Sequence, residues 1–236
     1  MGHVAPSVDI ARKSTHNKVQ LWEGGPYWAD TNIGAENPWD YGYYFWWGDI
    51  VGYKHENNTW TASDGSSSGF LFNEENTPTY DKNIATLYSG GWIVLGEEKK
   101  SFFGTLFDLR EDCVLSLKHD AAQMQNGCGW RMPTRQELAD LCKKCEWIWT
   151  QMNGINGYII RGRGSYASVS IFLPATGYGY GTSLNHVGSN GYYWSSVPLS
   201  GYGNSLYLHF DSGGYGLNCY YRLIGRPVRP VQGFTK

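Results

Sequence analysis

The clearest apolar pattern in the chain predicts an amphipathic helix that begins near residue 135. The apolar residues spaced i, i+3, i+4 and i+7 on one helical face are Leu138, Leu141, Cys142 and Cys145. Just before them, Thr134 can cap the free N–H groups while Glu137 reaches back, a pairing called a capping box. A weaker helical pattern covers Leu117–Gln125, and Gly127 is its expected stop.

The other apolar runs are short and predict strands. The expected strands are Tyr43–Trp47, Trp92–Leu95, Tyr158–Ile160, Val169–Leu173, Tyr193–Ser196 and Leu206–Phe210. The last run alternates apolar with polar or aromatic residues, so one strand face should be apolar and the other should carry contact groups. The 31 glycines and 18 tyrosines lie in short clusters, which favours many short strands and turns.

The sequence indicates one domain over residues 21–236, preceded by an N-terminal tail or cloning remnant over residues 1–20. Residues 1–20 are polar and lack the apolar core of a signal peptide, although a leader removed before Met1 would fit. The segment Asn57–Asn76 is linker-like, but ten of the eleven tryptophans lie on its two sides. We therefore expect it to be a long surface loop within the domain.

Composition narrows the functional classes. The chain has 19 basic and 21 acidic residues with no long run of either sign, which argues against nucleic-acid binding. Its apolar stretches are too short to cross a bilayer, so no membrane helix is expected. Five cysteines cannot all form intramolecular disulfides, and their number does not decide the compartment.

The C-terminal quarter differs from the rest of the chain. Between Gly177 and Ile224, 30 of 48 residues are Tyr, Gly, Ser or Asn, and only Asp211 and Arg222 are charged. A solvated surface carries about a quarter or more charged residues, so this is not an ordinary surface. Antibody binding loops share this composition, because tyrosine supplies stiff contact area and the small polar residues supply adaptable hydrogen bonds. A glycine- and tyrosine-rich β-structure without a partner is the alternative, and composition alone does not separate the two.

Several motifs occur in an order that points to one protein group. They are Gly25–Ala35, Tyr41–Asp49, His119–Ala122, Trp130–Thr134, Phe172–Ala175, Tyr193–Ser196 and Gly225–Val231. Over about residues 21–234 the chain resembles bacterial proteins with the C-type-lectin fold of the formylglycine-generating-enzyme subtype. Within that group it is most similar to the variable proteins of diversity-generating retroelements. The resemblance implies an α+β fold with two helices, short antiparallel sheets and long loops, and with N- and C-terminal strands close together.

The resemblance also implies a binding function. In such proteins the C-terminal region is diversified by mutagenesis at adenines, which can turn Asn codons into Tyr, Ser, Asp, His, Gly, Cys, Leu or Ile codons but never yields Lys, Glu, Gln, Trp or Met. Residues 177–224 fit that rule except for Trp194, which belongs to the fixed motif Tyr193–Ser196. Related proteins are exported, often as surface lipoproteins. The resemblance therefore implies a hypervariable cell-surface binder, expected to be a monomer, with a protein or glycan ligand.

The resemblance further assigns fixed and variable positions. The fixed frame contains Leu206, Leu208, Phe210, Arg222, Gly225 and Val228, which are expected to be buried. The variable positions are expected to form one flat ligand-binding face. They are Tyr178, Tyr180, His186, Tyr192, Tyr202, Asn204, Tyr207, His209, Asp211, Tyr215, Leu217, Asn218, Tyr220, Tyr221, Leu223 and Ile224. Arg226–Pro227 departs from the family's commoner aromatic–Ser pair, which leaves the edges of this set open.

Catalysis is not expected. Catalytic members of the wider group use two nearby cysteines before the terminal motif, and here only Cys219 lies in that stretch. A redox or zinc role for Cys142 and Cys145 competes with a simpler one as buried core, because both lie beyond the helix start and no second pair has zinc spacing. An oxidase of the formylglycine-generating type remains the least favoured alternative.

No cofactor or functional metal is expected either. Calcium-dependent sugar binding needs several clustered oxygen ligands, and residues 177–224 hold one carboxylate, that of Asp211. A structural ion near Asp40, Asp49 or Asp64 stays open. A glycan-binding lectin that stacks its tyrosines on sugars is the main alternative to a protein receptor.

Overall fold

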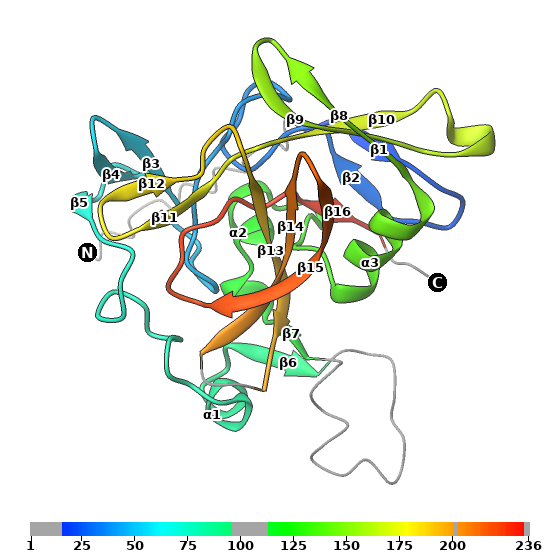
Figure 1. Ribbon diagram of the computed structural model, residues 1–236. Coiled ribbons are helices and arrows are strands. Elements are labelled where there is room, and N and C mark those ends of the chain that lie inside the picture. The colour runs from blue at the N-terminus through cyan, green and yellow to red at the C-terminus, as the bar shows by residue number, and fades with distance from the viewer. Residues whose placement is uncertain (1–15, 96–112, 201–202, 234–236) are drawn as a thin grey trace, which may run out of the picture.

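A computed structural model describes residues 16–95, 113–200 and 203–233 of the protein (Figure 1). Its α-helices are α1 (Ile84–Ser89), α2 (Ala121–Asn126) and α3 (Arg135–Lys144), and its 3-10 helices are η2 (Leu117–His119) and η3 (Gly164–Tyr166). The strands of the first half are β1 (Lys18–Gln20), β2 (Tyr27–Ala29), β3 (Tyr53–Glu56), β4 (Thr59–Ala62), β5 (Ser68–Phe70), β6 (Ile93–Leu95) and β7 (Cys113–Leu115). Those of the second half are β8 (Glu146–Met152), β9 (Ile155–Arg161), β10 (Ser170–Pro174), β11 (Tyr178–Tyr180), β12 (Ser183–Asn185), β13 (Gly191–Pro198), β14 (Asn204–Asp211), β15 (Gly214–Tyr221) and β16 (Val231–Gln232).

The architecture is mostly β, and the expected α+β class with two helices is wrong. The strands of the described ranges form several small antiparallel sheets, and the three α-helices are short. Most apolar runs in the sequence are too short to form helices, and the many glycines allow the chain to turn between one run and the next. One expected detail is present, because β16 pairs with β2 and so joins the two ends of the described chain.

The helix predictions succeeded where capping residues were visible. Thr134 caps α3, and Glu137 completes the capping box. The expected helix over Leu117–Gln125 is interrupted at Asp120, because its carboxylate caps a new helix, α2. Gly127 ends α2 with a positive φ of 58°.

Five of the six expected strands are found, within β6, β9, β10, β13 and β14. The run Tyr43–Trp47 is not a regular strand and makes only isolated bridges, such as the one between Phe45 and Arg226. The long loop expected over Asn57–Asn76 is also wrong. That segment contains β4 and β5, and Trp60 in β4 is fully buried.

The sheet β13–β14–β15 lies between two parts of the hydrophobic core. Trp194 and Tyr207 belong to one cluster, whereas Tyr193, Leu208 and Phe210 belong to the other. Because successive side chains of a strand point to opposite faces, β13 and β14 each contribute to both clusters. Both faces of this sheet are therefore partly buried, and β15 forms one of its edges.

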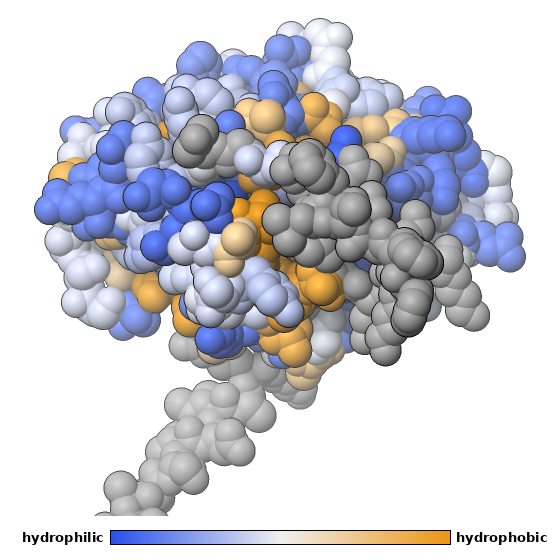
Figure 2. All heavy atoms as spheres, turned by 90° about the horizontal axis from the view of Figure 1, so that it is seen from below, coloured by the Kyte–Doolittle hydropathy of each residue, from blue (hydrophilic) through white to orange (hydrophobic). Residues whose placement is uncertain are grey.

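The end of the molecule that carries α1 and β6 shows apolar atoms gathered near its centre (Figure 2). Val94 and Leu95 of β6 are among the exposed large apolar side chains. Within the described ranges, no helix combines the length and the apolar character needed to cross a bilayer.

Candidate ligand-binding face

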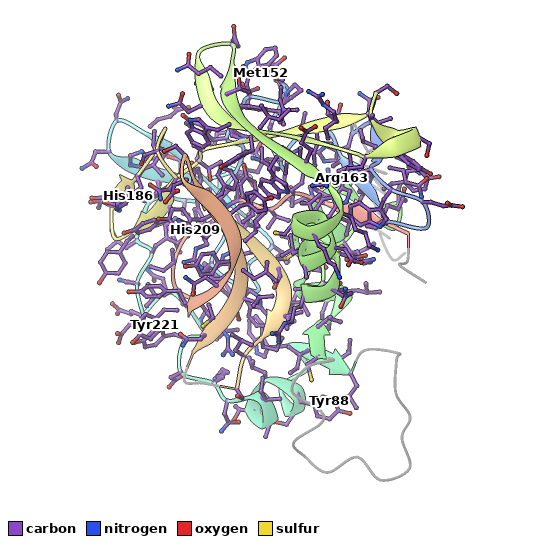
Figure 3. All side chains as sticks on the ribbon, turned by 45° about the vertical axis from the view of Figure 1, so that its right-hand side comes forward. Tyr88, Met152, Arg163, His186, His209 and Tyr221 are labelled. Atoms are coloured by element: carbon purple, nitrogen blue, oxygen red, sulfur yellow. The ribbon has the colours of Figure 1, made fainter. Side chains whose placement is uncertain are left out.

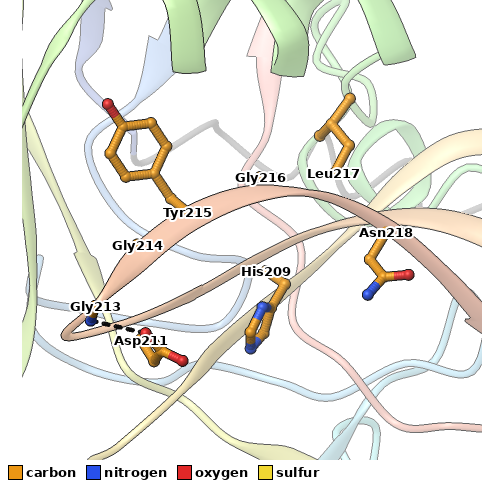
Figure 4. Close-up of a pocket in the computed structure, with 8 residues that line it drawn as sticks. All are labelled: His209, Asp211, Gly213, Gly214, Tyr215, Gly216, Leu217 and Asn218. Atoms are coloured by element: carbon orange, nitrogen blue, oxygen red, sulfur yellow. Dashed lines mark hydrogen bonds between the residues drawn. The ribbon is translucent and has the colours of Figure 1, made fainter.

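The register of β14 and β15 divides the expected contact residues between two faces. Tyr207 pairs with Asn218, whereas Phe210 pairs with Tyr215. Directly opposed residues of an antiparallel pair lie on the same face, so Asn218 and Tyr215 point in opposite directions. Figure 4 shows Asn218 on the opposite side of the hairpin from Tyr215 and Leu217. The expectation of one flat face is therefore wrong for these residues.

One of the two faces carries a continuous row of aromatic rings, which we call the tyrosine face. The Tyr178 and His186 rings stack with their centroids 5.6 Å apart. Tyr178 meets Tyr192 edge-on at 5.2 Å, and Tyr192 lies 4.9 Å from His209. Figure 3 shows His186 and His209 on the same side of the molecule. The tyrosine face comprises Tyr178, His186, Tyr192, His209, Asn218 and Tyr220. It also includes Tyr180, because this residue follows Tyr178 by two positions in β11 and so points to the same side of the strand.

A buried arginine lies beneath this row of rings. The guanidinium carbon of Arg226 is 3.6 Å from the ring centroid of Tyr207 and 4.1 Å from that of Trp194. The rings of Tyr192 and Tyr220 lie at 5.7 Å and 5.9 Å. We call these five residues the Arg226 cluster. Burial lowers the pKa of Arg226 to about 10, so it is still a cation at neutral pH.

Sequence reasoning did not select Arg226 as a functional residue. In the sequence it was noted only as part of Arg226–Pro227, which departs from a family pattern. A sequence does not show that four aromatic side chains will surround one guanidinium. The β-bridge between Phe45 and Arg226 fixes the backbone at Arg226 against a segment far away in the sequence. This long-range contact places the guanidinium among the rings.

Three expected contact residues are buried, and their assignment to the ligand surface is wrong. Tyr207, Leu223 and Ile224 are 6%, 4% and 3% exposed. Tyr207 is covered because its ring packs on Arg226 and meets Trp194 edge-on. Leu223 and Ile224 follow the end of β15 and belong to the same core cluster. Tyr202 lies outside the described residues.

The opposite face of the hairpin joins a second aromatic group. The Tyr215 ring stacks on that of Trp147 in β8, with the centroids 4.1 Å apart. Leu217 packs against the same core cluster as Trp147. The sequence prediction missed β8, although the alternation of Trp147 and Trp149 with smaller or polar residues was a usable strand signal.

A hollow of about 480 Å³ follows the turn and first half of β15. Its lining residues are His209, Asp211, Gly213, Gly214, Tyr215, Gly216, Leu217 and Asn218 (Figure 4). The side chains drawn around the glycines come from both faces of the hairpin, so the hollow wraps around its edge. The expected contact residues among them are His209, Asp211, Tyr215, Leu217 and Asn218.

The polar groups beside this hollow are partly committed to local structure. The Asp211 carboxylate accepts a hydrogen bond from the N–H of Gly213 at 2.7 Å and so stabilises the turn. Burial lowers the pKa of His209 and so favours its neutral ring. The Asn190 side-chain amide lies 3.2 Å from Nε2 of His209 and can donate to it.

The last expected contact residues lie at the far end of the hairpin. Asn204 pairs with Tyr221 across β14 and β15. Asn204 is half-buried, whereas Tyr221 is exposed and lies 5.8 Å from the ring of Tyr80. Tyr221 also meets Tyr220 edge-on, which connects this end to the tyrosine face.

The cysteines provide no activated nucleophile in the α3 region. Burial raises the pKa of Cys142 to about 11 and that of Cys145 to about 12, so both are protonated at neutral pH. Redox and zinc chemistry need the thiolate, which these surroundings disfavour. Cys219 is exposed on β15.

The acidic residues considered for a structural ion serve as turn caps. Asp49 accepts the N–H groups of Val51 and Gly52, and Asp40 accepts that of Asn37. Asp64 accepts an N–H in the same way, from Ser66. Within the described ranges, no group of three or more His, Cys, Asp or Glu side chains is placed to hold a metal ion.

Comparisons with protein-family models, with curated proteins and with solved structures found no match for this chain.

Proposed function

We propose that this protein is a non-catalytic ligand-binding protein of the diversity-generating-retroelement variable type, and that its recognition surface is the tyrosine face. The observation that carries the proposal is the continuous row of partly exposed rings from His186 to His209, with Tyr220 on the same face of the sheet. Exposed tyrosines offer a large, stiff contact area at low entropic cost.

The division between frame and surface supports this proposal. Leu206, Leu208 and Phe210 of the expected frame are buried, and Arg222 is held by several hydrogen bonds. By contrast, Tyr180 and Tyr220 are about half exposed, at 57% and 48%. Side chains that bury little area contribute little to folding, so such positions can change while the fold is kept.

The resemblance extends the proposal to cellular location. Variable proteins of this kind are exported and act at the cell surface, which suits a static recognition domain. We propose the same location here, with a protein as the ligand and a glycan as the alternative that the experiment below distinguishes.

The test is an alanine scan of the tyrosine face against ligands found by screening the whole chain on protein and glycan arrays. We expect binding to weaken in Tyr180→Ala, His186→Ala and Tyr192→Ala, with Kd raised about five-fold or more in each, because anchors of this type dominate the binding energy. Tyr27→Ala and Tyr88→Ala remove exposed tyrosines elsewhere in the chain and should leave Kd unchanged. A Tyr215→Ala arm measures the contribution of the opposite face.

The outcome that contradicts the proposal is also defined. If the two control variants abolish binding while the three face variants keep it, the ligand binds elsewhere and the tyrosine face has no recognition role.

A further inference from the structure

Three buried arginines lie near the C-terminal end of the chain. Two of them, Arg222 and Arg229, each donate four hydrogen bonds. The acceptors of Arg222 are Ser205 Oγ (2.9 Å) and the carbonyl oxygens of Thr79 (3.0 Å), Lys82 (2.7 Å) and Leu199 (3.3 Å). The acceptors of Arg229 are Asn32 Oδ1 (2.9 Å) and the carbonyl oxygens of Ala29 (3.1 Å), Asp30 (3.0 Å) and Phe172 (2.9 Å). These two residues therefore hold distant segments together and have a structural role.

Arg226 differs from both. It is only 2% exposed, yet its Nε and Nη1 have no hydrogen-bond partner among the described residues. Its surroundings are ring faces, which attract a cation but accept hydrogen bonds poorly. A buried charge without acceptors is costly, so a guanidinium in this state is prepared to receive an acceptor from outside.

A second donor lies on the same face. Asn218 is opposite Tyr207, and its Oδ1 accepts the N–H of Cys219 at 2.7 Å. That bond orients the Asn218 amide and leaves its NH₂ group as a donor with no partner recorded within the described ranges. The face thus offers an amide donor near a buried cation, and both donors suit a negatively charged acceptor.

Tyr220 is the most exposed of the four rings around Arg226. It lies on the edge strand β15, is half exposed, and places its ring 5.9 Å from the guanidinium carbon. Tyr207 and Trp194 are deeply buried, and Tyr192 is partly buried. Tyr220 is therefore the ring whose rotation toward solvent meets the least packing.

We propose that the Arg226 cluster is a specificity pocket for a carboxylate of the ligand, with Tyr220 as the side chain that moves aside. A carboxylate matches the planar, two-pronged donor geometry of a guanidinium, and a flat group fits between ring faces. The broad face around the cluster suits an acidic side chain of a protein partner. This inference rests on the proposed function, since it identifies the chemistry that the tyrosine face selects.

The test is an NMR titration of the ¹⁵N-labelled full chain with benzoate and with benzamide, its neutral counterpart. Benzoate should shift the Nε–Hε resonance of Arg226 and leave those of Arg222 and Arg229 in place. Its Kd should be at least about ten-fold lower than that of benzamide, because a hydrogen bond between two charged groups is much stronger than a neutral one. N-acetylglutamate should also bind more tightly than glucuronate if the natural source is a protein.

Variants separate recognition from folding. Arg226→Met should abolish the preference for benzoate, and Arg226→Lys should weaken it, because the charge remains but the planar fork is lost. Tyr220→Ala should leave benzoate binding as tight or make it tighter, because it removes the cover. Arg161→Met removes a half-exposed arginine of β9 and should change nothing.

Equal binding of benzoate and benzamide to the unmodified chain would overturn the inference, even if Arg226→Met did not fold. So would equal shifts at all three buried arginines, or loss of benzoate binding in Tyr220→Ala. Tighter binding of glucuronate than of N-acetylglutamate would reject the protein source. None of these results touches the alanine scan above, so failure here and failure of the proposed function are distinguishable.

Discussion

Individual buried carboxylates give this protein a definite pH response. Asp49 is 4% exposed, and burial raises its pKa to about 6, although the N–H groups of Val51 and Gly52 act in the opposite direction. Its folded-state pKa therefore lies above the ordinary value of 3.8. Between these two values the folded state holds a proton that the unfolded state releases, so the contribution of Asp49 to stability falls as pH rises.

We predict that the free energy of unfolding of Asp49→Asn, measured relative to that of the unmodified protein, increases as the pH rises from 4 to 7. The reason is that the asparagine does not ionise, whereas Asp49 loses its proton in that window at a cost to the folded state. Urea unfolding of both proteins at pH 4 and pH 7 measures the change in their difference. Asp81→Asn removes a carboxylate at an exposed position and should show no such trend. A difference that stays constant with pH would contradict the prediction.

Of the contact positions implied by the resemblance, most of those described are exposed or half-exposed and three are buried. Tyr180, His186 and Tyr220 lie on the surface as expected. The expectation failed at Tyr207, because a tyrosine in a repeating polar position is buried when another layer packs on that face of the strand. Amphipathic residues therefore need the tertiary context before they can be assigned to a surface.

At the scale of elements, α3 shows how a local pattern can suffice. Thr134 and Glu137 bond each other's backbone, and the buried Glu137 carboxylate also pairs with Arg131 at 2.5 Å. These contacts fall within seven residues, so the sequence contains all of them. The strands β4 and β5 were missed although their pairing is local, because the burial of Trp60 depends on residues elsewhere in the chain such as Tyr44 and Leu184.

We predict that the two halves of this cap differ in strength. Thr134→Ala should lower the free energy of unfolding by about 1 kcal/mol, which is typical for an N-cap. Glu137→Gln should lower it by roughly 3 kcal/mol, because it removes the charge of the buried Glu137 carboxylate and so breaks its ion pair with Arg131. Lys143→Ala, on the exposed side of α3, is the control and should have little effect. Equal losses in the first two variants would show that the ion pair is not the dominant contact.

At the scale of the whole molecule, the residues that form the core differ from those of the proposed recognition surface. The frame consists of the two core clusters on either side of β13–β14–β15 and of the saturated arginines Arg222 and Arg229. The exposed rings lie outside this frame. A protein that changes its ligand by changing surface residues requires this separation.

We predict that replacing four exposed residues together leaves the fold intact. The combined variant carries alanine at Tyr180, His186, Tyr220 and Tyr221, all of which are exposed. Its free energy of unfolding should change by less than about 1 kcal/mol, because substitutions at exposed positions have small effects. Tyr207→Ala, by contrast, should cost roughly 3 kcal/mol or more, since it leaves a cavity beside Arg226. Comparable losses in both variants would show that the surface residues belong to the frame.

The sequence by itself determined the features that depend on neighbours along the chain. The cap of α3, the stop at Gly127, five of the strands and the unusual composition of the C-terminal quarter are all local. Only the tertiary structure decided which side of β14 is buried, how the register of β15 divides the contact residues, and where Arg226 lies. The register of β15, a strand that the sequence analysis did not predict, is set within the β14–β15 hairpin. The buried side of β14 and the place of Arg226 depend on packing between segments more than a hundred residues apart, such as the bridge from Phe45 to Arg226, and long-range packing leaves no local pattern to read.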